Sequence, residues 1–174
     1  LSTDFITNEV PYLPIFMVPF QFLSMIKVEY SFILWTLINS IVFILYMRFF
    51  IKELTGHTLS NKILLLALIS LPFFQNFLYG QSNILLTICA GEFYRAMKGD
   101  KPAKAGLWLG GWLLKPQLLI IIIPILIIWL SRKTLKGFII SSFTLLLISF
   151  GIIKIDGFQR LFNKLLNYAK GDAL

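Results

Sequence analysis

Acidic residues, cysteine and histidine are all scarce in this chain. Its 174 residues contain eight Asp or Glu, one cysteine and one histidine. Cys89 has no second cysteine with which to form a disulfide, and it stands alone within an apolar segment. His57 is also isolated, in a polar linker, whereas a metal site needs several ligands brought together. The sequence therefore predicts no metal site and implies no cofactor.

Charged residues make up only 14% of the chain, whereas hydrophobic residues make up 57% and aromatic residues 16%. An average soluble domain is about half apolar and about a quarter charged. A core of this size cannot cover so many apolar side chains, so lipid must contact much of the surface. We therefore expect an all-α integral membrane protein that crosses the cell membrane several times.

Basic residues outnumber acidic residues by 16 to 8, which gives a formal net charge of +8. A nucleic-acid-binding protein collects its cations on one face. Here the cations are scattered over short connections between apolar segments, so no nucleic acid partner is expected. They report instead on the side of the membrane on which each connection lies.

The two ends of the sequence look internal to a longer protein. No initiating Met precedes Leu1, and no basic stretch leads into an apolar one as in a signal peptide. The chain stops in a polar segment. We expect a fragment of a longer membrane protein, with membrane lipid as its surroundings.

Residues 1–30 are expected to form the end of an external loop and an interfacial segment. A polar stretch leads to Pro11, Pro14 and Pro19. Proline removes a backbone donor and restricts the residue before it, so three prolines in nine residues are predicted to exclude one regular helix. A bent segment that lies at the membrane surface is expected up to residue 26.

Residues 31–153 are expected to form a transmembrane core of about six short or broken elements. The clearest is 31–50, which is about as long as the 20 residues that a bilayer demands. The others are 63–78, interrupted at Pro72, then 84–94, then 105–130, which counts as two if it turns back at Lys115, and 137–153. Residues 154–174 are predicted to begin an external segment with an amphipathic helix that lies on the membrane.

The topology depends on whether residues 105–130 cross the membrane once or turn back at Lys115. A turn places ten Lys or Arg on one side and six on the other, whereas a single kinked span gives eleven against four with Lys115 in mid-membrane. The charge count does not decide. A lysine stranded in the membrane costs roughly 3 kcal/mol or more, and Pro116 disfavours a helix at Lys115, so we predict a hairpin.

The hairpin brings three polar elements to the non-cytoplasmic face. They are the segment from Pro11 to Pro14, the tetrad Gly80-Gln81-Ser82-Asn83 and the apex Lys115-Pro116-Gln117. Polar groups at membrane depth are candidates for function. We expect them to surround a shallow cavity below the outer surface.

Three motifs resemble a known family. They are Tyr12-Leu13-Pro14 ahead of the apolar Pro19 stretch, the tetrad at the start of an apolar helix, and Gly106 to Gly111 leading to Lys115-Pro116. In this order they resemble the integral-membrane glycosyltransferases of family 87, the polyprenol-phosphate-mannose-dependent mannosyltransferases. The resemblance implies the multi-spanning fold called GT-C. It also implies a polyprenyl-phosphate sugar as donor and the transfer of a hexose, mannose by analogy, to a lipid or glycan acceptor.

The sequence departs from that family pattern in two places. Such families use an acidic residue in the first external loop, upstream of the segment that resembles Tyr12-Leu13-Pro14, and they commonly have two prolines in that segment. The resemblance therefore places the catalytic base before residue 1, the catalytic residues here stay unknown, and we expect the fragment alone to be inactive.

Glycosyl transfer from a lipid phosphate needs a base for the acceptor hydroxyl and a cation for the leaving phosphate. Lys115 fits the second role, although a lysine that only reaches for the interface would look the same. Gln81 and Asn83 could bind sugar hydroxyls or phosphate, although Ser82 and Asn83 could instead cap the helix that starts at Ile84. The predicted substrate-binding residues are Lys115, Gln81, Asn83, Tyr12 and Gln117.

Two other classes of function stay open. In a transporter or flippase, broken helices and midplane polar groups would form a substrate path, together with an internal repeat that this sequence does not show convincingly. In a membrane scaffold without a site, Lys115, Gln81 and the Pro11 segment would lie far apart. Glu92 and Arg95, three residues apart, are predicted to form an ion pair at the cytoplasmic end.

Overall fold

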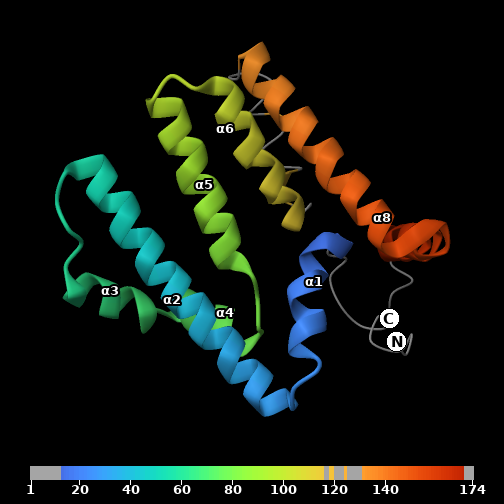
Figure 1. The fold of residues 1–174 in the computed structure, drawn as a ribbon, viewed down its shortest axis with the longest axis horizontal. Helices are drawn as coiled ribbons and strands as arrows, with labels where there is room; N and C mark the ends of the chain where they lie inside the picture. The colour runs from blue at the N-terminus through green and yellow to red at the C-terminus, as the bar shows by residue number, and fades with distance from the viewer. Residues whose placement is uncertain (1–12, 116–117, 120–123, 125–130, 171–174) are drawn as a thin grey trace.

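The computed structural model describes residues 13–115, 118–119, 124 and 131–170, and every regular element within them is helical. The α-helices are α1 (Pro14–Leu23), α2 (Val28–Thr55), α3 (Asn61–Leu68), α4 (Leu71–Leu78), α5 (Asn83–Lys98), α6 (Pro102–Leu109) and α8 (Arg132–Lys170). A 3₁₀ helix, η2 (Gly110–Leu114), continues α6. Helices α2, α5, α6 and α8 follow one another across the molecule, with α1 beside α8 (Figure 1).

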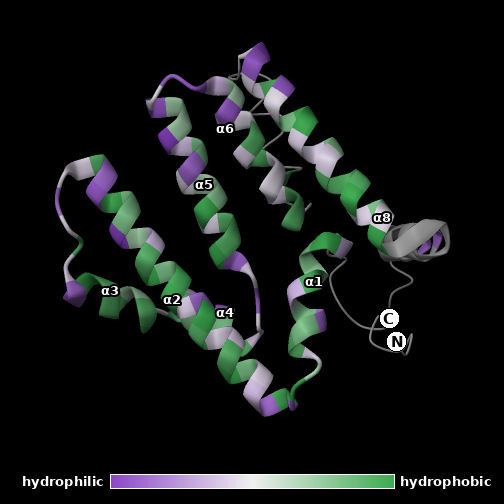
Figure 2. Ribbon diagram, in the orientation of Figure 1, coloured by the Kyte–Doolittle hydropathy of each residue, from purple (hydrophilic) through white to green (hydrophobic). Residues whose placement is uncertain are grey.

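Two helices are long and apolar enough to cross a membrane, α2 and residues Arg132–Ile152 of α8. A third span is possible if α3 and α4, which bend by 52° at their junction, count as one. Apolar residues dominate the middle of α2, and polar residues gather at the connections (Figure 2). The all-α membrane class is confirmed, whereas six spanning elements and a GT-C fold stay predictions.

Proline acts as predicted in α4 but not in α1. Pro72 lies in the first turn of α4, where no helical partner exists for a backbone N–H, and the break in 63–78 falls there. The prediction that the prolines exclude a regular helix near the start of the chain is wrong. Pro14 begins α1 for the same reason, and the helix continues through Pro19 at the loss of one backbone hydrogen bond.

Helix α6 lies at the centre of the packed core. Ala105, Leu109 and Leu114 are almost fully buried between α5 and α8. Glycines allow this close approach, because a Cβ on Gly106 would meet the Thr134 carbonyl oxygen of α8. Small residues are the usual means by which membrane helices pack tightly.

The glycine contacts show that α6 and α8 run parallel. Gly137 of α8 lies against Ala103, near the start of α6, and Ser141, one turn further along α8, lies against Gly110. The chain therefore returns between Lys115 and Ser131 to the end at which α6 began. This arrangement favours the predicted hairpin over a single kinked span, which would make α8 antiparallel to α6.

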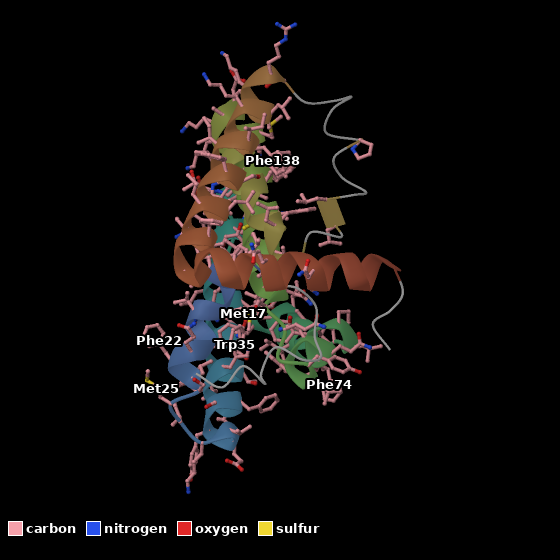
Figure 3. All side chains as sticks on the ribbon, turned by 90° about the vertical axis from the view of Figure 1, so that its right-hand side faces the viewer. Met17, Phe22, Met25, Trp35, Phe74 and Phe138 are labelled. Atoms are coloured by element: carbon pink, nitrogen blue, oxygen red, sulfur yellow. The ribbon has the colours of Figure 1, made fainter. Side chains whose placement is uncertain are left out.

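Helix α8 is continuous from Arg132 to Lys170 but bends, so that its later part turns sharply away from the direction of its first part and crosses the view at about mid-height (Figure 3). The candidate span within it, Arg132–Ile152, overlaps the predicted span 137–153. The helix predicted within 154–174 thus continues the span without a break as far as Lys170. Its amphipathic contact with the membrane stays a prediction.

Candidate functional site

The tetrad forms a tight turn between α4 and α5. Gly80 has a φ of 58°, a left-handed conformation that glycine adopts readily. Asn76, in α4, fixes the residues that follow, since its backbone carbonyl accepts from the Gln81 N–H at 2.8 Å. Its side-chain Oδ1 accepts from the Asn83 N–H at 3.2 Å. The turn is thereby held from inside the protein.

Asn76 is a residue that the sequence reasoning missed. Only 5% of it is exposed, and its side-chain Nδ2 has no hydrogen-bond partner among the described residues. A buried amide with a free donor is costly in an apolar helix. The signal that could have revealed it is an asparagine, beside Gln75, in an α4 that is otherwise apolar, four residues before Gly80.

Lys115 reaches the tetrad from the end of η2. Its Nζ donates to Gln81 Oε1 at 3.1 Å, and Asn83 Nδ2 donates to the same oxygen at 2.7 Å. The structure therefore brings together three of the five predicted site residues, from two separate parts of the chain. Tyr12 and Gln117 lie outside the described residues.

The alternative role of the tetrad as a helix cap fails for its serine. Ser82 stands at the N-cap of α5 and is buried, yet its side chain makes no capping hydrogen bond. Asn83 is the first residue of α5, and its side chain turns to Gln81. The Asn83 amide is thus committed to the polar cluster of Asn76, Gln81, Asn83 and Lys115, which we call the amide–lysine cluster.

Helices α1 and α2 close one side of the tetrad. Trp35 Nε1 donates to the Gly80 carbonyl at 3.1 Å, and the Trp35 ring lies 4.6 Å from that of Phe20 in α1. Figure 3 shows Trp35 beside α1. At its other end, α1 contacts α8, where the Ile15 N–H donates to Ser149 Oγ at 3.4 Å. The tetrad, Trp35 and α1 are therefore neighbours.

The electrostatics of the cluster favour a negatively charged ligand. No carboxylate forms an ion pair with Lys115 among the described residues. Lys115 lies between helices, outside the candidate spans, and burial lowers the pKa of its ammonium. An anion near Nζ would offset that desolvation, because charges interact more strongly where water is scarce.

The opposite end of the bundle is basic and holds the ion pairs. Arg95 Nη1 donates to Glu92 Oε1 at 2.7 Å, which confirms the predicted pair, and Arg95 Nη2 lies 3.3 Å from Glu53 Oε1 of α2. Two cavities, of about 370 and 240 Å³, are lined by residues of this end. The cavity predicted beside the tetrad stays a prediction.

Comparison with known proteins identifies one family. The model of glycosyltransferase family 87 matches residues 11–172. No curated protein and no solved structure is detectably similar to the chain.

Proposed function

The chain belongs to glycosyltransferase family 87, and on that premise we propose that it transfers a hexose, mannose by analogy, from a polyprenyl-phosphate sugar. The acceptor in this proposal is a lipid or glycan on the non-cytoplasmic face of the membrane. The family establishes a membrane glycosyltransferase. The identity of the donor, the acceptor and the face are the proposed parts.

The observation that carries the proposal is the hydrogen bond between Lys115 and Gln81. It places a lysine that pairs with no carboxylate among the described residues beside the amides of the tetrad. In the transfer, the bond between the anomeric carbon and the phosphate oxygen breaks as the acceptor oxygen bonds to that carbon. The acceptor proton passes to a base, and polyprenyl phosphate leaves with an additional negative charge.

Lys115 is the group that we assign to the leaving phosphate. Its Nζ would exchange the Gln81 oxygen for a phosphate oxygen, and the charge that develops there would be stabilised most in the transition state. The Gln81 and Asn83 amides would then be free to bind sugar hydroxyls. Asn76 would hold the turn that carries both of them.

The acceptor base is assigned to no residue of the cluster. Glu53 and Glu92 are engaged by Arg95 at the basic end of the bundle. In this proposal the base comes from outside the amide–lysine cluster, in agreement with the family pattern in which an acidic residue of the first external loop serves.

The charge distribution supports the proposed face. Cations gather where α5 ends and where α6 and α8 begin (Figure 2), and such an end usually faces the cytoplasm. The tetrad lies at the far end of α5 from these cations. A site at the tetrad would then open to the non-cytoplasmic side, where polyprenyl-phosphate sugars would be met.

The bend between α3 and α4 is a feature that a transporter would share. A membrane scaffold without a site would hold Lys115 and Gln81 far apart. The hydrogen bond between them argues against a scaffold. Family membership favours the transferase over both.

Replacing Lys115 by Met tests the proposal. In membranes that contain the intact protein, with its first external loop, and polyprenyl-phosphate-mannose, we expect release of polyprenyl phosphate to fall about 100-fold or more. One stabilising group for a developing anion is commonly worth that much. Lys115→Arg should retain part of the rate. Lys133→Met, which removes an exposed lysine at the basic end, is the matched control and should leave the rate unchanged.

Membrane insertion is measured for all three variants. A Lys115→Met protein that inserts normally and transfers at the parent rate would return Lys115 to a purely interfacial role. Transfer from a nucleotide sugar, with no turnover of the polyprenyl-phosphate donor, would overturn the proposed donor class.

A further inference from the structure

Helix α2 leaves the apolar region at Arg48. Between Glu29 and Arg48 lie 18 residues without a charge, which span about 27 Å at about 1.5 Å each. The hydrocarbon core of a bilayer is about 30 Å thick. Arg48 and Lys52, one turn apart, therefore lie at the depth of lipid headgroups.

A cavity of about 370 Å³ opens beside these two cations, between the end of α2 and the start of α3. Its lining residues are Arg48, Phe49, Lys52, Thr58, Leu59 and Asn61. Arg48 Nη2 donates to Asn61 Oδ1 at 2.7 Å, which fixes the guanidinium at the cavity wall. The remaining guanidinium N–H groups can bind two oxygen atoms of a phosphate.

The two cations of this cavity, Arg48 and Lys52, differ from Arg95 in their ion pairs. Within the part of the chain that the structure describes, no carboxylate forms an ion pair with Arg48 or Lys52. Arg95 at the same end differs, because Glu53 and Glu92 both bind it. The lining of the cavity between α2 and α3 contains two cations and no carboxylate, whereas Glu53 and Glu92 line the second cavity. An external anion therefore meets no repulsive carboxylate in the first cavity.

An exposed apolar stripe leads up to the cavity along α2. Ile41, Leu45 and Phe49 follow at four-residue spacing, and each has between 47 and 62% of its surface exposed. Residues at this spacing lie on one face of a helix. A ligand with an acyl chain would use both the stripe and the cations, whereas free phosphate would use the cations alone.

We propose that this cavity binds the headgroup phosphate of an anionic phospholipid. Arg48 and Lys52 bind the phosphate oxygens, and an acyl chain lies along Ile41, Leu45 and Phe49. Basic pockets between membrane helices are suited to such lipids. The site lies at the opposite end of α2 from Trp35 and the tetrad, so it is independent of the proposed transfer reaction.

Lipid retention by the protein purified from membranes tests the proposal. Native mass spectrometry in mixed micelles compares phosphatidylglycerol with phosphatidylcholine. We expect the parent to retain phosphatidylglycerol preferentially, and Arg48→Ala with Lys52→Ala to retain it roughly 30-fold less well. Lys52→Gln alone leaves the Arg48–Asn61 bond in place and should lose about fivefold, which keeps the test informative if the double variant does not insert.

The matched control removes two cations elsewhere at the same end, by Lys133→Ala with Lys136→Ala in α8. It should bind as the parent does. Equal losses in both double variants would show that net charge alone attracts the lipid, and unchanged retention in the first would also overturn the site. Displacement of phosphatidylglycerol by millimolar inorganic phosphate would identify a free anion as the ligand and contradict the lipid assignment.

Discussion

Asn76 connects the sequence of α4 to the chemistry of the tetrad. Its two oxygen atoms accept from the backbone N–H groups of Gln81 and Asn83, and the side chains of Asn83 and Lys115 both donate to Gln81 Oε1. A local hydrogen bond thus determines where two candidate ligands point. Asn76 is a positioning residue, since its effect on a substrate would pass through the residues that it holds.

Replacing Asn76 by Leu should lower sugar transfer and loosen the turn. The Asn83 N–H would lose its partner, at a cost of about 1–3 kcal/mol for a buried unsatisfied group. Asn76→Asp keeps an oxygen acceptor and should retain more activity than Asn76→Leu. We expect Asn76→Leu to raise KM for the donor more than it lowers kcat, because it displaces groups that contact the substrate and not the reacting atoms.

The neighbour Gln75 supplies the control for this comparison. It is exposed on the same helix, so Gln75→Leu makes the same chemical change without touching the turn. Equal kinetics for Asn76→Leu, Gln75→Leu and the parent would show that the Asn76 hydrogen bond has no role in positioning.

At the scale of the elements, the sequence predicts breaks better than it predicts helix ends. The break at Pro72 was predictable because proline favours a first turn and ends whatever precedes it. Helix α1 was not predictable in this way. Pro19 costs the helix one hydrogen bond, and the contacts of α1 with α8 and Trp35 can offset that loss. Likewise, α5 extends from Asn83 to Lys98, beyond the predicted 84–94, because its polar last turn is still paired through Arg95.

The site was also only partly predictable from the sequence. Lys115 and the tetrad could be predicted from polarity alone, since polar residues are rare in apolar surroundings. The direct bond between Lys115 and Gln81, 34 positions apart, depends on how α5 and α6 pack, and no local pattern encodes it. Trp35 shows this too, because its indole N–H could bind many carbonyls and only the fold selects Gly80.

The close contact of α6 with α8 makes a prediction for Gly106. A methyl group there would meet the Thr134 carbonyl and the backbone nitrogen of Phe138, which cannot move as a flexible side chain can. We expect Gly106→Ala to lower the free energy of unfolding by about 1–3 kcal/mol, as overpacking commonly does. The measurement is thermal unfolding of the protein in detergent.

Gly151, on α8, is the matched control. A Cβ there meets nothing within 4 Å, so Gly151→Ala should be neutral or should stabilise the helix by about 0.5–1 kcal/mol. If both alanine variants melted like the parent, the tight parallel packing of α6 and α8 would be refuted.

At the scale of the whole molecule, the parallel packing of α6 and α8 determines which residues lie at each end of the bundle. The tetrad and Lys115 share one end, whereas Ser131 and the first turn of α8 lie at the other, beside the start of α6. The proposed reaction and the proposed lipid site then lie on opposite sides of the membrane. This separation follows from α2, which holds Trp35 beside the tetrad at one end and lines the basic cavity at the other. The hairpin adds that the first turn of α8 lies at the basic end.

Cysteine labelling in sealed cells tests this order directly. Cys89 is first replaced by Ser, so that a membrane-impermeant maleimide reports only on introduced thiols. Tyr79→Cys, beside the tetrad, and Lys133→Cys, in the first turn of α8, are both exposed positions. We expect Tyr79→Cys to react in intact cells and Lys133→Cys to react only after the membrane is opened, because α5 and α8 present opposite ends at these residues. Thr58→Cys, beside the basic cavity, should behave like Lys133→Cys, and labelling of Tyr79→Cys and Lys133→Cys from the same side would contradict the hairpin and the assignment of two faces together.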